Sequence, residues 1–243
     1  MPRLILTCLL ALFAATASAS AQNFNAQEQS EIRAIVREYL VRNPDVLREA
    51  LDALAERSRA ERWQRMRSDP RDFSLGPANA PIVIVEFFDY RCAYCHAALE
   101  WVDDIRRTRS DVRIVLKEFP ILSTPDGPSF EAARAAVAAM PQGRYWAFHR
   151  ALMSFRGDLT SARVDQLARA SGIDVPRMRR AMYDPEVTRI LEDNRALAVD
   201  AGANATPLFI INGEQISGFD PQRLDARLRE ATREVRERRQ AQR

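Results

Sequence analysis

The chain has 243 residues, of which 47% are hydrophobic, and this length allows a sizeable apolar core to form without disulfide support. Its 36 basic and 33 acidic side chains are interspersed, so the net charge of +3 does not favour nucleic-acid binding. Three cysteines are too few for a disulfide-stapled scaffold.

The first 21 residues have the layout of a secretory signal peptide. An early arginine is followed by the apolar run LILTCLLALFAA and then by small residues, with Ala-x-Ala patterns that place cleavage after Ala19 or Ala21. The apolar run is shorter than the roughly 20 residues of a membrane-spanning helix, so we expect an exported, periplasmic protein without stable membrane insertion. Cys8 lies too early for a lipoprotein signal, so cleavage leaves only Cys92 and Cys95.

Residues 22–70 are predicted to form a helical arm. Asn25 with Glu28 three positions on matches a capping box, and Asn43-Pro44-Asp45 matches the start of a second helix. The apolar stripes of the two helices consist of Ile32, Ile35, Val36, Tyr39 and Leu40, and of Val46, Leu47, Ala50, Leu51 and Leu54. The stripes would be buried either by packing onto the main domain or, as we favour, by coiled-coil-like self-association.

The main domain is predicted to span residues 71–243, after a linker rich in turn formers at 68–81. It opens with an apolar run of strand length at 81–90, which is typical of a strand buried on both faces. A helix at 93–108 and a second apolar strand at 112–120 follow. Together they form a β-α-β unit, and this implies that the two strands pair in parallel.

The second half of the domain is predicted to be mostly helical. Residues 122–203 form the insertion, in which alanine-rich periodicity with several breaks indicates four or five helices. Two short strands then flank Asn212-Gly213, a strong hairpin signal, and Asp220-Pro221 starts a last helix. This order predicts an α/β protein with a thioredoxin fold that contains an inserted all-helical subdomain.

The motif CAYCH at residues 92–96 fits two kinds of chemistry. Cys-x-x-Cys is a redox dithiol, whereas Cys-x-x-Cys-His attaches a c-type haem, with His96 as one axial ligand and Met140, Met153 or His149 as the other. A buried strand directly before the motif favours the dithiol. A zinc site is the poorest alternative, because no second cysteine pair or histidine pair is present. His96 and His149 are expected to be a surface residue and a packing residue.

Dithiol chemistry assigns different tasks to the two cysteines. The thiolate is the nucleophile, and Cys92 lies where a strand meets a helix, so backbone N–H groups and the helix dipole favour its anion, with a small addition from Arg91. Cys95 falls inside the first turn and is expected to be the shielded resolving thiol. Glu86 is a carboxylate in an otherwise apolar run. It is either a buried group that exchanges the proton of Cys95 or an edge-strand residue that faces water.

The ordered set of strand, FFDYRCAYC, helical insertion, Thr206-Pro207 and hairpin resembles the DsbA-like branch of thioredoxin-fold thiol-disulfide oxidoreductases, over about residues 72–240. The arm EQSEIRAIVREYLVRNPDVLREAL resembles the N-terminal segment of proteins related to ScsC, the suppressor of copper sensitivity protein C. The resemblance implies an acid at Glu86 beneath the disulfide. It also implies a cis Pro207 facing the dithiol, with the Thr206 backbone pairing with an extended substrate.

The resemblance implies a protein disulfide isomerase or reductase that acts on exported proteins. A membrane-bound thiol reductase would keep it reduced, and residues 22–70 would make a homo-oligomer, with a trimer favoured. Its redox group is the Cys92–Cys95 disulfide, and no separate cofactor is expected. Tyr94 stands where strongly oxidising relatives place a histidine, which disfavours the alternative of a DsbA-type oxidase. Copper(I) binding by Cys92 and Cys95, a c-type haem protein and a binding protein with a vestigial dithiol are the minor alternatives.

Overall fold

The computed structural model describes residues 24–242, and the predicted signal peptide lies outside them. The chain divides into two compact units, Met1–Leu54 and Ala55–Arg243. The last turns of the second arm helix therefore belong to the unit that carries the cysteines, whereas the sequence placed the boundary after residue 70. Within the described residues, no helix combines the length and the apolar character needed to cross a membrane.

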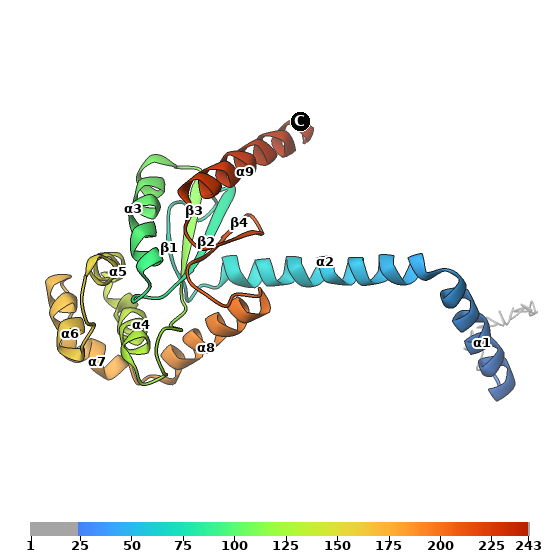
Figure 1. The fold of residues 1–243 in the computed structure, drawn as a ribbon, viewed down its shortest axis with the longest axis horizontal. Coiled ribbons are helices and arrows are strands. Elements are labelled where there is room, and N and C mark those ends of the chain that lie inside the picture. Colours follow the sequence, from blue (N-terminus) through green and yellow to red (C-terminus); the bar gives the residue numbers. More distant parts are fainter. Residues whose placement is uncertain (1–23, 243) are drawn as a thin grey trace, which may run out of the picture. The chain divides into compact units, whose positions relative to one another are not determined.

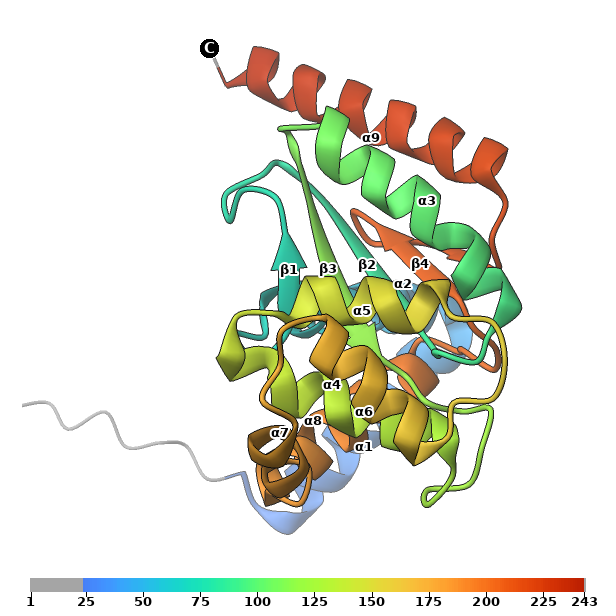
Figure 2. The ribbon, with the colours of Figure 1, turned by 90° about the vertical axis from the view of Figure 1, so that its left-hand side faces the viewer.

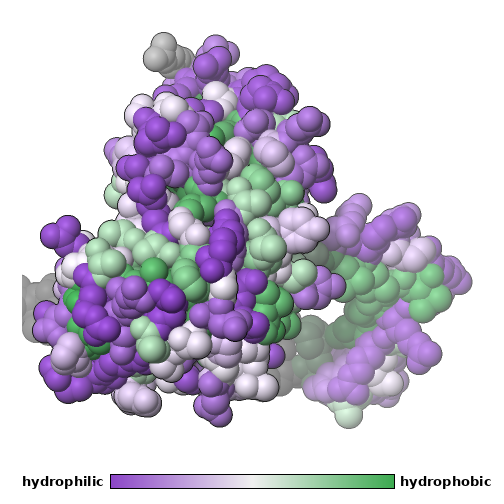
Figure 3. Space-filling view, turned by 60° about the vertical axis from the view of Figure 1, so that its left-hand side comes forward, coloured by the Kyte–Doolittle hydropathy of each residue, from purple (hydrophilic) through white to green (hydrophobic). Residues whose placement is uncertain are grey.

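The arm consists of helix α1, Ala26–Arg42, and helix α2, Pro44–Ser68 (Figure 1). The predicted capping box is present, because the Asn25 side chain accepts the Glu28 N–H while the Glu28 carboxylate accepts the Asn25 N–H. Figure 3 shows apolar side chains gathered along one side of the arm helices. The exposed large apolar residues of the arm include Ile32, Ile35, Val36, Tyr39, Val46, Leu47, Leu51 and Leu54. The arm therefore has no core of its own.

The unit that carries the cysteines, Ala55–Arg243, is built on a five-stranded sheet with the order β1-β3-β2-β4-β5 (Figure 1). The strands are β1, Phe73–Leu75; β2, Ile82–Phe88; β3, Val112–Glu118; β4, Leu208–Ile211; and β5, Glu214–Ser217. β2 and β3 are parallel and the other neighbours are antiparallel. The predicted β-α-β unit and the hairpin are therefore confirmed, and so is the thioredoxin-like fold.

Strand β1 lies in the segment that the sequence predicted to be a linker. Phe73 pairs with Leu116 and Leu75 with Ile114, so this segment forms an edge of the sheet. The prediction was wrong because a strand of three residues is too short to show a period-two pattern. Gly76 follows with a φ of 88°, and a Cβ there would lie 2.2 Å from the Val112 carbonyl oxygen. Only glycine allows this close return of the chain beside β3.

Alternate residues of β2 face opposite sides of the sheet. Ile82, Ile84 and Phe88 belong to the core with helix α3, Ala93–Thr108, and helix α9, Pro221–Ala241. The residues between them face the end of α2 and helix α8, Pro185–Asp200, in the second part of the core: Val83, Val85 and Phe87. Figure 2 shows α3 and α9 side by side on the first face. Period-two alternation places Glu86 on that face, towards α3.

The helical insertion confirms the prediction of four or five helices and no strand. It comprises α4, Pro128–Ala139; a 3₁₀ turn, Met140–Gln142; α5, Tyr145–Ser154; α6, Ser161–Ala170; α7, Val175–Ala181; and α8. Prolines and capping side chains start several of these helices, including Pro185 after Asp184. Helix α5 packs against α3, so the insertion supports the helix that follows the cysteines.

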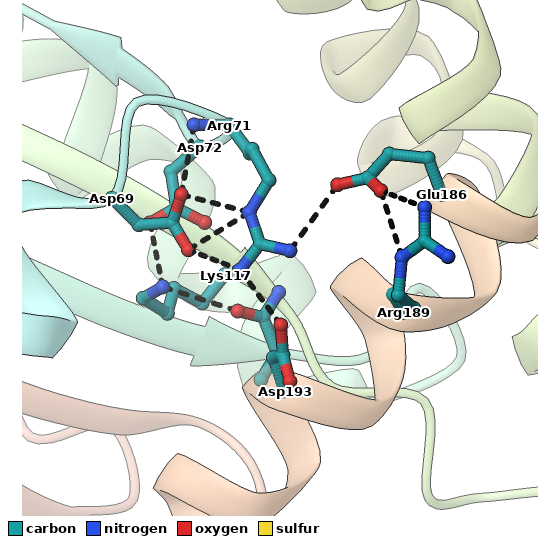
Figure 4. A network of polar contacts seen from close by, with 8 residues as sticks. Asp69, Arg71, Asp72, Lys117, Glu186, Arg189 and Asp193 are labelled. Atoms are coloured by element: carbon teal, nitrogen blue, oxygen red, sulfur yellow. Dashed lines mark hydrogen bonds and ion pairs between the residues drawn. The ribbon is translucent and has the colours of Figure 1, made fainter.

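A polar network ties the segment between α2 and β1 to helix α8 (Figure 4). Arg71 donates to Asp69 at 2.6 Å and to Asp193 of α8 at 2.7 Å, and it also contacts Glu186 at 3.3 Å. These acids raise the pKa of Arg71, with the hydrogen bond to Asp69 as the largest cause. The segment is therefore anchored at its start by charge as well as by the β1–β3 pairing.

Beside this network lies a buried ion pair. Nζ of Lys117 is 2.5 Å from Oδ2 of Asp72, and both side chains are almost completely buried. Lys117 also donates to Oδ1 of Asn194 at 3.1 Å. Burial raises the pKa of Asp72 to about 6 despite the neighbouring Lys117. The pair therefore ties β3 to the segment before β1 and to α8, at the cost of desolvating two charges.

Replacing Lys117 with alanine tests this pair. The change leaves Asp72 buried without its cation, so the free energy of unfolding is expected to fall by about 3–5 kcal/mol in urea denaturation. The loss of Lys117 raises the Asp72 pKa further, and an ionised Asp72 then costs more as the pH rises. The deficit should therefore be larger near pH 8 than near pH 5.

Two further variants control this experiment. Arg189→Ala removes a partner of Glu186 at the exposed edge of the same network, and it should leave the urea midpoint nearly unchanged. The double variant Lys117→Met, Asp72→Asn should recover part of the lost stability, because no charge is then left buried. An equal loss in Arg189→Ala, or a pH-independent deficit in Lys117→Ala, would contradict the assignment.

Candidate active site

Cys92 lies at the junction between β2 and α3, where the sequence predicted it. It is the N-cap residue of α3 with extended backbone angles, and its amide donates to the Asp89 carbonyl oxygen at 3.0 Å. Cys92 is 6% exposed and Cys95 is 1% exposed, and both carry free thiols. Cys92 is the less buried of the two cysteines and is therefore the one that an incoming disulfide meets first.

The surroundings of Cys92 stabilise its thiolate. They lower its pKa to about 5, chiefly through a hydrogen bond from the Cys95 thiol, against the opposing effect of burial. The side chain of Thr206 and the backbone N–H groups of Cys95 and Tyr94 lower the Cys92 pKa further. The Arg91 guanidinium donates to the Leu122 carbonyl oxygen at 2.9 Å, so it has another partner. The anion is therefore held by the helix start and the second thiol, as expected from a strand-to-helix junction.

Cys95 and Glu86 lie behind Cys92 and prefer their protonated forms. Burial is the largest cause of the raised pKa of Cys95, followed by its hydrogen bond to Cys92. Glu86 is 3% exposed in the central strand β2, paired on one side with β3 and on the other with β4. The edge-strand alternative is therefore wrong. Burial, and then the negative charge of Cys92, raise the pKa of Glu86 to about 8.

The loop before β4 reaches the dithiol from a distant part of the chain. The Thr206-Pro207 peptide bond is cis, as expected. Sγ of Cys92 lies 3.1 Å from the Thr206 carbonyl oxygen, and Thr206 is 7% exposed. The fold thus brings Glu86, both cysteines and the Thr206-Pro207 loop into one place. Tyr94 differs from this group, because its side chain is 65% exposed beside Cys92.

His96 is held by neighbours on both ring nitrogens. Nε2 lies 2.7 Å from the carbonyl oxygen of Tyr90, and Nδ1 lies 3.1 Å from Nη1 of Arg156. A carbonyl oxygen only accepts, so Nε2 carries the proton and Nδ1 accepts from the arginine. Both nitrogens are therefore engaged within the protein, which argues against His96 as an axial haem ligand.

A buried network that the sequence analysis missed supports the loop before Cys92. Oε1 of Glu118 accepts from the hydroxyls of Tyr90 and Tyr145, each at 2.8 Å. The Tyr90 oxygen is also 3.2 Å from Nδ1 of His149, which must donate because the Tyr90 proton is used. Burial lowers the pKa of His149 to about 3 and raises that of Glu118 well above its usual range. His149 is thus a packing residue, as predicted.

Asp89, which the sequence analysis also missed, holds the same loop before Cys92. Oδ2 of Asp89 accepts the backbone N–H groups of Ile121 and Leu122, at 2.8 and 2.9 Å. Its other oxygen accepts from the Ser129 hydroxyl at 2.9 Å and from the Arg91 amide at 2.8 Å. Asp89 therefore joins the residues before Cys92 to the start of the helical insertion. Its position at the end of an apolar strand was the available signal in the sequence.

Comparisons with known proteins agree with this geometry. A family model described as a DSBA-like thioredoxin domain matches residues 83–229, which is more than half of the chain. The chain belongs to the DsbA-like thioredoxin family. Both free cysteines, Cys92 and Cys95, lie within the matched residues. A second model, described as the N-terminal domain of the copper resistance protein ScsC, matches residues 28–61 in the arm.

Solved structures of similar proteins support the same assignment. A thioredoxin-like oxidoreductase from Silicibacter pomeroyi is 37% identical, with a TM-score of 0.66 over 72% of this chain and 97% of the other. A periplasmic thioredoxin-like protein from Salmonella enterica is 25% identical, with a TM-score of 0.63 over 70% and 95%. A variant of Proteus mirabilis ScsC shares the fold at 24% identity and a TM-score of 0.66, over 88% of this chain and 100% of the other.

The curated relatives that match are much longer than this chain. An Na(+)/H(+) antiporter NhaA from Herminiimonas arsenicoxydans is 35% identical over 68% of this chain and 26% of its own length. A second NhaA, from a Mycobacterium strain, is 32% identical over 62% of this chain and 25% of its own length. The chain thus spans about a quarter of the length of these relatives.

The pH dependence of Cys92 alkylation tests the thiolate directly. Since the thiolate reacts and its pKa is lowered to about 5, the rate with iodoacetamide should be flat at neutral pH and fall through about pH 5. In Cys95→Ala, the midpoint should move towards neutral pH, because the largest hydrogen-bond donor is lost. Cys92→Ala should abolish the fast reaction. A midpoint near the ordinary cysteine value of about 8.5 would contradict the geometry.

Proposed function

We propose that this protein is an exported disulfide isomerase and reductase that acts on protein substrates through Cys92 and Cys95. The observation that carries the proposal is the division of the dithiol, with an accessible low-pKa sulfur at Cys92 and a buried protonated thiol at Cys95. Such a pair attacks a disulfide at one sulfur and keeps the second in reserve.

The reaction begins at the Cys92 thiolate. Its sulfur attacks one sulfur of a substrate disulfide, a new S–S bond forms between protein and substrate, and the other substrate sulfur leaves as a thiolate. That thiolate can attack a different bond of the substrate, which completes an isomerisation and frees Cys92. Alternatively the Cys95 sulfur attacks Cys92, which releases the reduced substrate and leaves the Cys92–Cys95 disulfide. Both routes conserve electrons and atoms.

Glu86 is proposed to take the proton that Cys95 must lose. The Cys92 charge is one of the two causes that raise the Glu86 pKa. When Cys92 is joined to a substrate this charge is absent, so Glu86 ionises more readily at the stage when Cys95 needs a base. The same loss of charge removes one cause of the raised Cys95 pKa. Formation of the mixed disulfide therefore prepares both groups for the second step.

Substrate binding is proposed at the Thr206-Pro207 loop. The Thr206 carbonyl oxygen faces the Cys92 sulfur at 3.1 Å, so an extended substrate that pairs with this backbone would place its sulfur beside Cys92. The exposed Tyr94 ring stands next to this position and offers apolar contact area. Backbone pairing suits an enzyme with many clients, because it does not depend on the client's side chains.

The direction of electron flow is proposed from the same thiolate. The Cys92 pKa of about 5 lies between the values of about 7 for thioredoxin and about 3.5 for the strong oxidant DsbA. This intermediate value alone fits either direction, and Tyr94 in place of a histidine is the feature that favours a reductant or isomerase over a powerful oxidase. A DsbA-type oxidase is the alternative. The isomerase role requires a membrane-bound thiol reductase that keeps the dithiol reduced.

The arm is proposed to assemble the protein into an oligomer, with a trimer favoured. Its exposed apolar residues form a stripe on each helix, and such stripes bury themselves by coiled-coil-like contacts. Several dithiols in one assembly could act on the same misfolded client. The periplasm is the proposed location, since the Salmonella neighbour is described as periplasmic and the predicted signal peptide directs export.

Copper binding is a second proposed role, favoured by the match of the arm to a copper resistance family. Cys92 and Cys95 are soft sulfur ligands that fit copper(I). Within residues 24–242, no cluster of three or more histidine, cysteine or acidic side chains is placed to hold a metal. A copper(I) ion would therefore rest on the two sulfurs, and its binding would compete with the redox reaction.

Glu86→Gln tests the proton transfer. The attack of Cys95 on the mixed disulfide, which releases the reduced substrate from Cys92, should slow by roughly 10²-fold, while the attack by Cys92 on the substrate should change little. In the natural protein the release rate should rise with pH as Glu86 ionises, with a midpoint below the pKa of about 8 that Glu86 has beside the Cys92 thiolate, and this rise should be missing in the variant. Glu100→Gln, an exposed acid on α3, is the matched control. Unchanged release in Glu86→Gln would contradict the role.

Glutamates introduced into the apolar stripes of the arm test both the proposed oligomer and the proposed isomerase activity. Ile35→Glu with Leu51→Glu should lower the mass measured by light scattering to that of a monomer and slow the refolding of scrambled ribonuclease. Reduction of insulin should persist, because it needs only one dithiol. Arg37→Glu is the control on the same helix. If the natural protein is monomeric and only oxidises reduced ribonuclease, the oxidase alternative is correct.

A further inference from the structure

A cavity of about 350 Å³ lies at the end of the sheet opposite the dithiol. Its lining comes from the end of α2, the turn before β2, the β4–β5 turn and the end of α9, and comprises Trp63, Arg67, Pro81, Asn212, Val235, Arg238, Arg239 and Gln242. Pro81 precedes β2 and Cys92 follows it, so the length of that strand separates the cavity from the active site. The described lining contains three arginines and no acidic residue.

Arg67 lines this cavity and lies beside a second arginine, Arg113, which is outside the lining. Arg113 of β3 donates to the Arg67 carbonyl oxygen, and the Arg67 guanidinium lies 5.8 Å from the Trp63 ring centre. Burial and the Arg67 charge lower the pKa of Arg113. Asp72 is the acid that acts on Arg113, but it is already paired with Lys117. The guanidinium groups of Arg67 and Arg113 are thus close enough to repel each other and are partly shielded from water.

The lack of a carboxylate partner distinguishes Arg67 and Arg113 from four other half-buried arginines of the described residues. Nε of Arg67 and Nε of Arg113 are buried without a hydrogen-bond partner, and so is Nε of Arg227, but another nitrogen of the Arg227 guanidinium pairs with Glu230 and Glu234. Four half-buried arginines elsewhere each have a carboxylate partner: Arg71 with Asp69, Arg109 with Asp111, Arg179 with Glu131, and Arg227 with Glu234. The comparison shows that the fold usually supplies an acid to a half-buried guanidinium. At this cavity the acid is missing.

We infer that the cavity binds an oxyanion of the phosphate type. Guanidinium groups match the spacing of phosphate oxygens and bind them in a bidentate manner. Arg67, Arg238 and Arg239 surround a volume that holds a phosphate or pyrophosphate group, while Trp63 and Val235 form an apolar wall. The group belongs either to a free phosphate compound or to an anionic lipid headgroup. This binding is independent of the proposed isomerase function.

Binding of inorganic pyrophosphate and of lipid vesicles tests the two sources. Isothermal titration of the full chain with pyrophosphate should show one site per chain, weakened by added salt because the attraction is electrostatic. Cosedimentation with phosphatidylglycerol vesicles, against phosphatidylcholine vesicles, tests the lipid source. Saturation by pyrophosphate identifies a free compound as sufficient, whereas binding only to the anionic vesicles identifies the headgroup. Failure of both probes overturns the inference.

Paired arginine variants locate the site. Arg238→Gln with Arg239→Gln changes two exposed residues of the cavity and should preserve the fold and insulin reduction, while the dissociation constant rises at least about tenfold. Arg223→Gln with Arg229→Gln removes the same charge from exposed positions on the same helix outside the cavity, and should leave binding within about twofold. Equal losses in the two double variants would show nonspecific attraction and overturn the site.

Discussion

The negative charge on the Cys92 sulfur is the feature on which the rest of the active site depends. The start of α3 and the Cys95 thiol stabilise it, and together they lower the pKa of Cys92. The same charge raises the pKa of Glu86 and of Cys95 behind it. Burial is the main reason why Glu86 and Cys95 stay protonated, and the charge on Cys92 adds to it. In the proposed mechanism, loss of this charge makes Glu86 and Cys95 easier to ionise, which couples the attack by Cys92 to the later attack by Cys95.

Holding that charge in place requires a rigid loop between β2 and α3. Asp89 fixes the loop to the backbone of residues 121–122, and Tyr90 fixes it to Glu118 and to the insertion through His149. Each of these polar groups is buried and would be costly if left unpaired. The helical insertion therefore does more than cover the sheet, because it supplies hydrogen-bond partners that hold the residues before Cys92.

Helix α2 runs along the chain across the boundary between the two units. Its last turns contribute Trp63 and Met66 to the core of the unit that carries the cysteines, and Arg71 and Asp72 then anchor the chain to α8 and β3. The apolar stripes of the preceding residues remain exposed. One continuous helix thus changes from a core element to an exposed apolar surface, and it is on this surface that the proposed assembly rests.

The sequence by itself determined the elements whose signals are local. Helical periodicity, capping residues and the Asn212-Gly213 turn depend on neighbours within a few positions, so they identified the arm, the insertion and the hairpin. The tertiary structure alone decided which charged residues are buried and with whom they pair. Glu86 and Glu118 both interrupt apolar strands, yet one faces the dithiol and the other two tyrosines. Strand β1, and the contact between Cys92 and Thr206 across 114 positions, likewise required the fold, because hydrogen bonding and desolvation depend on groups that are close only in space.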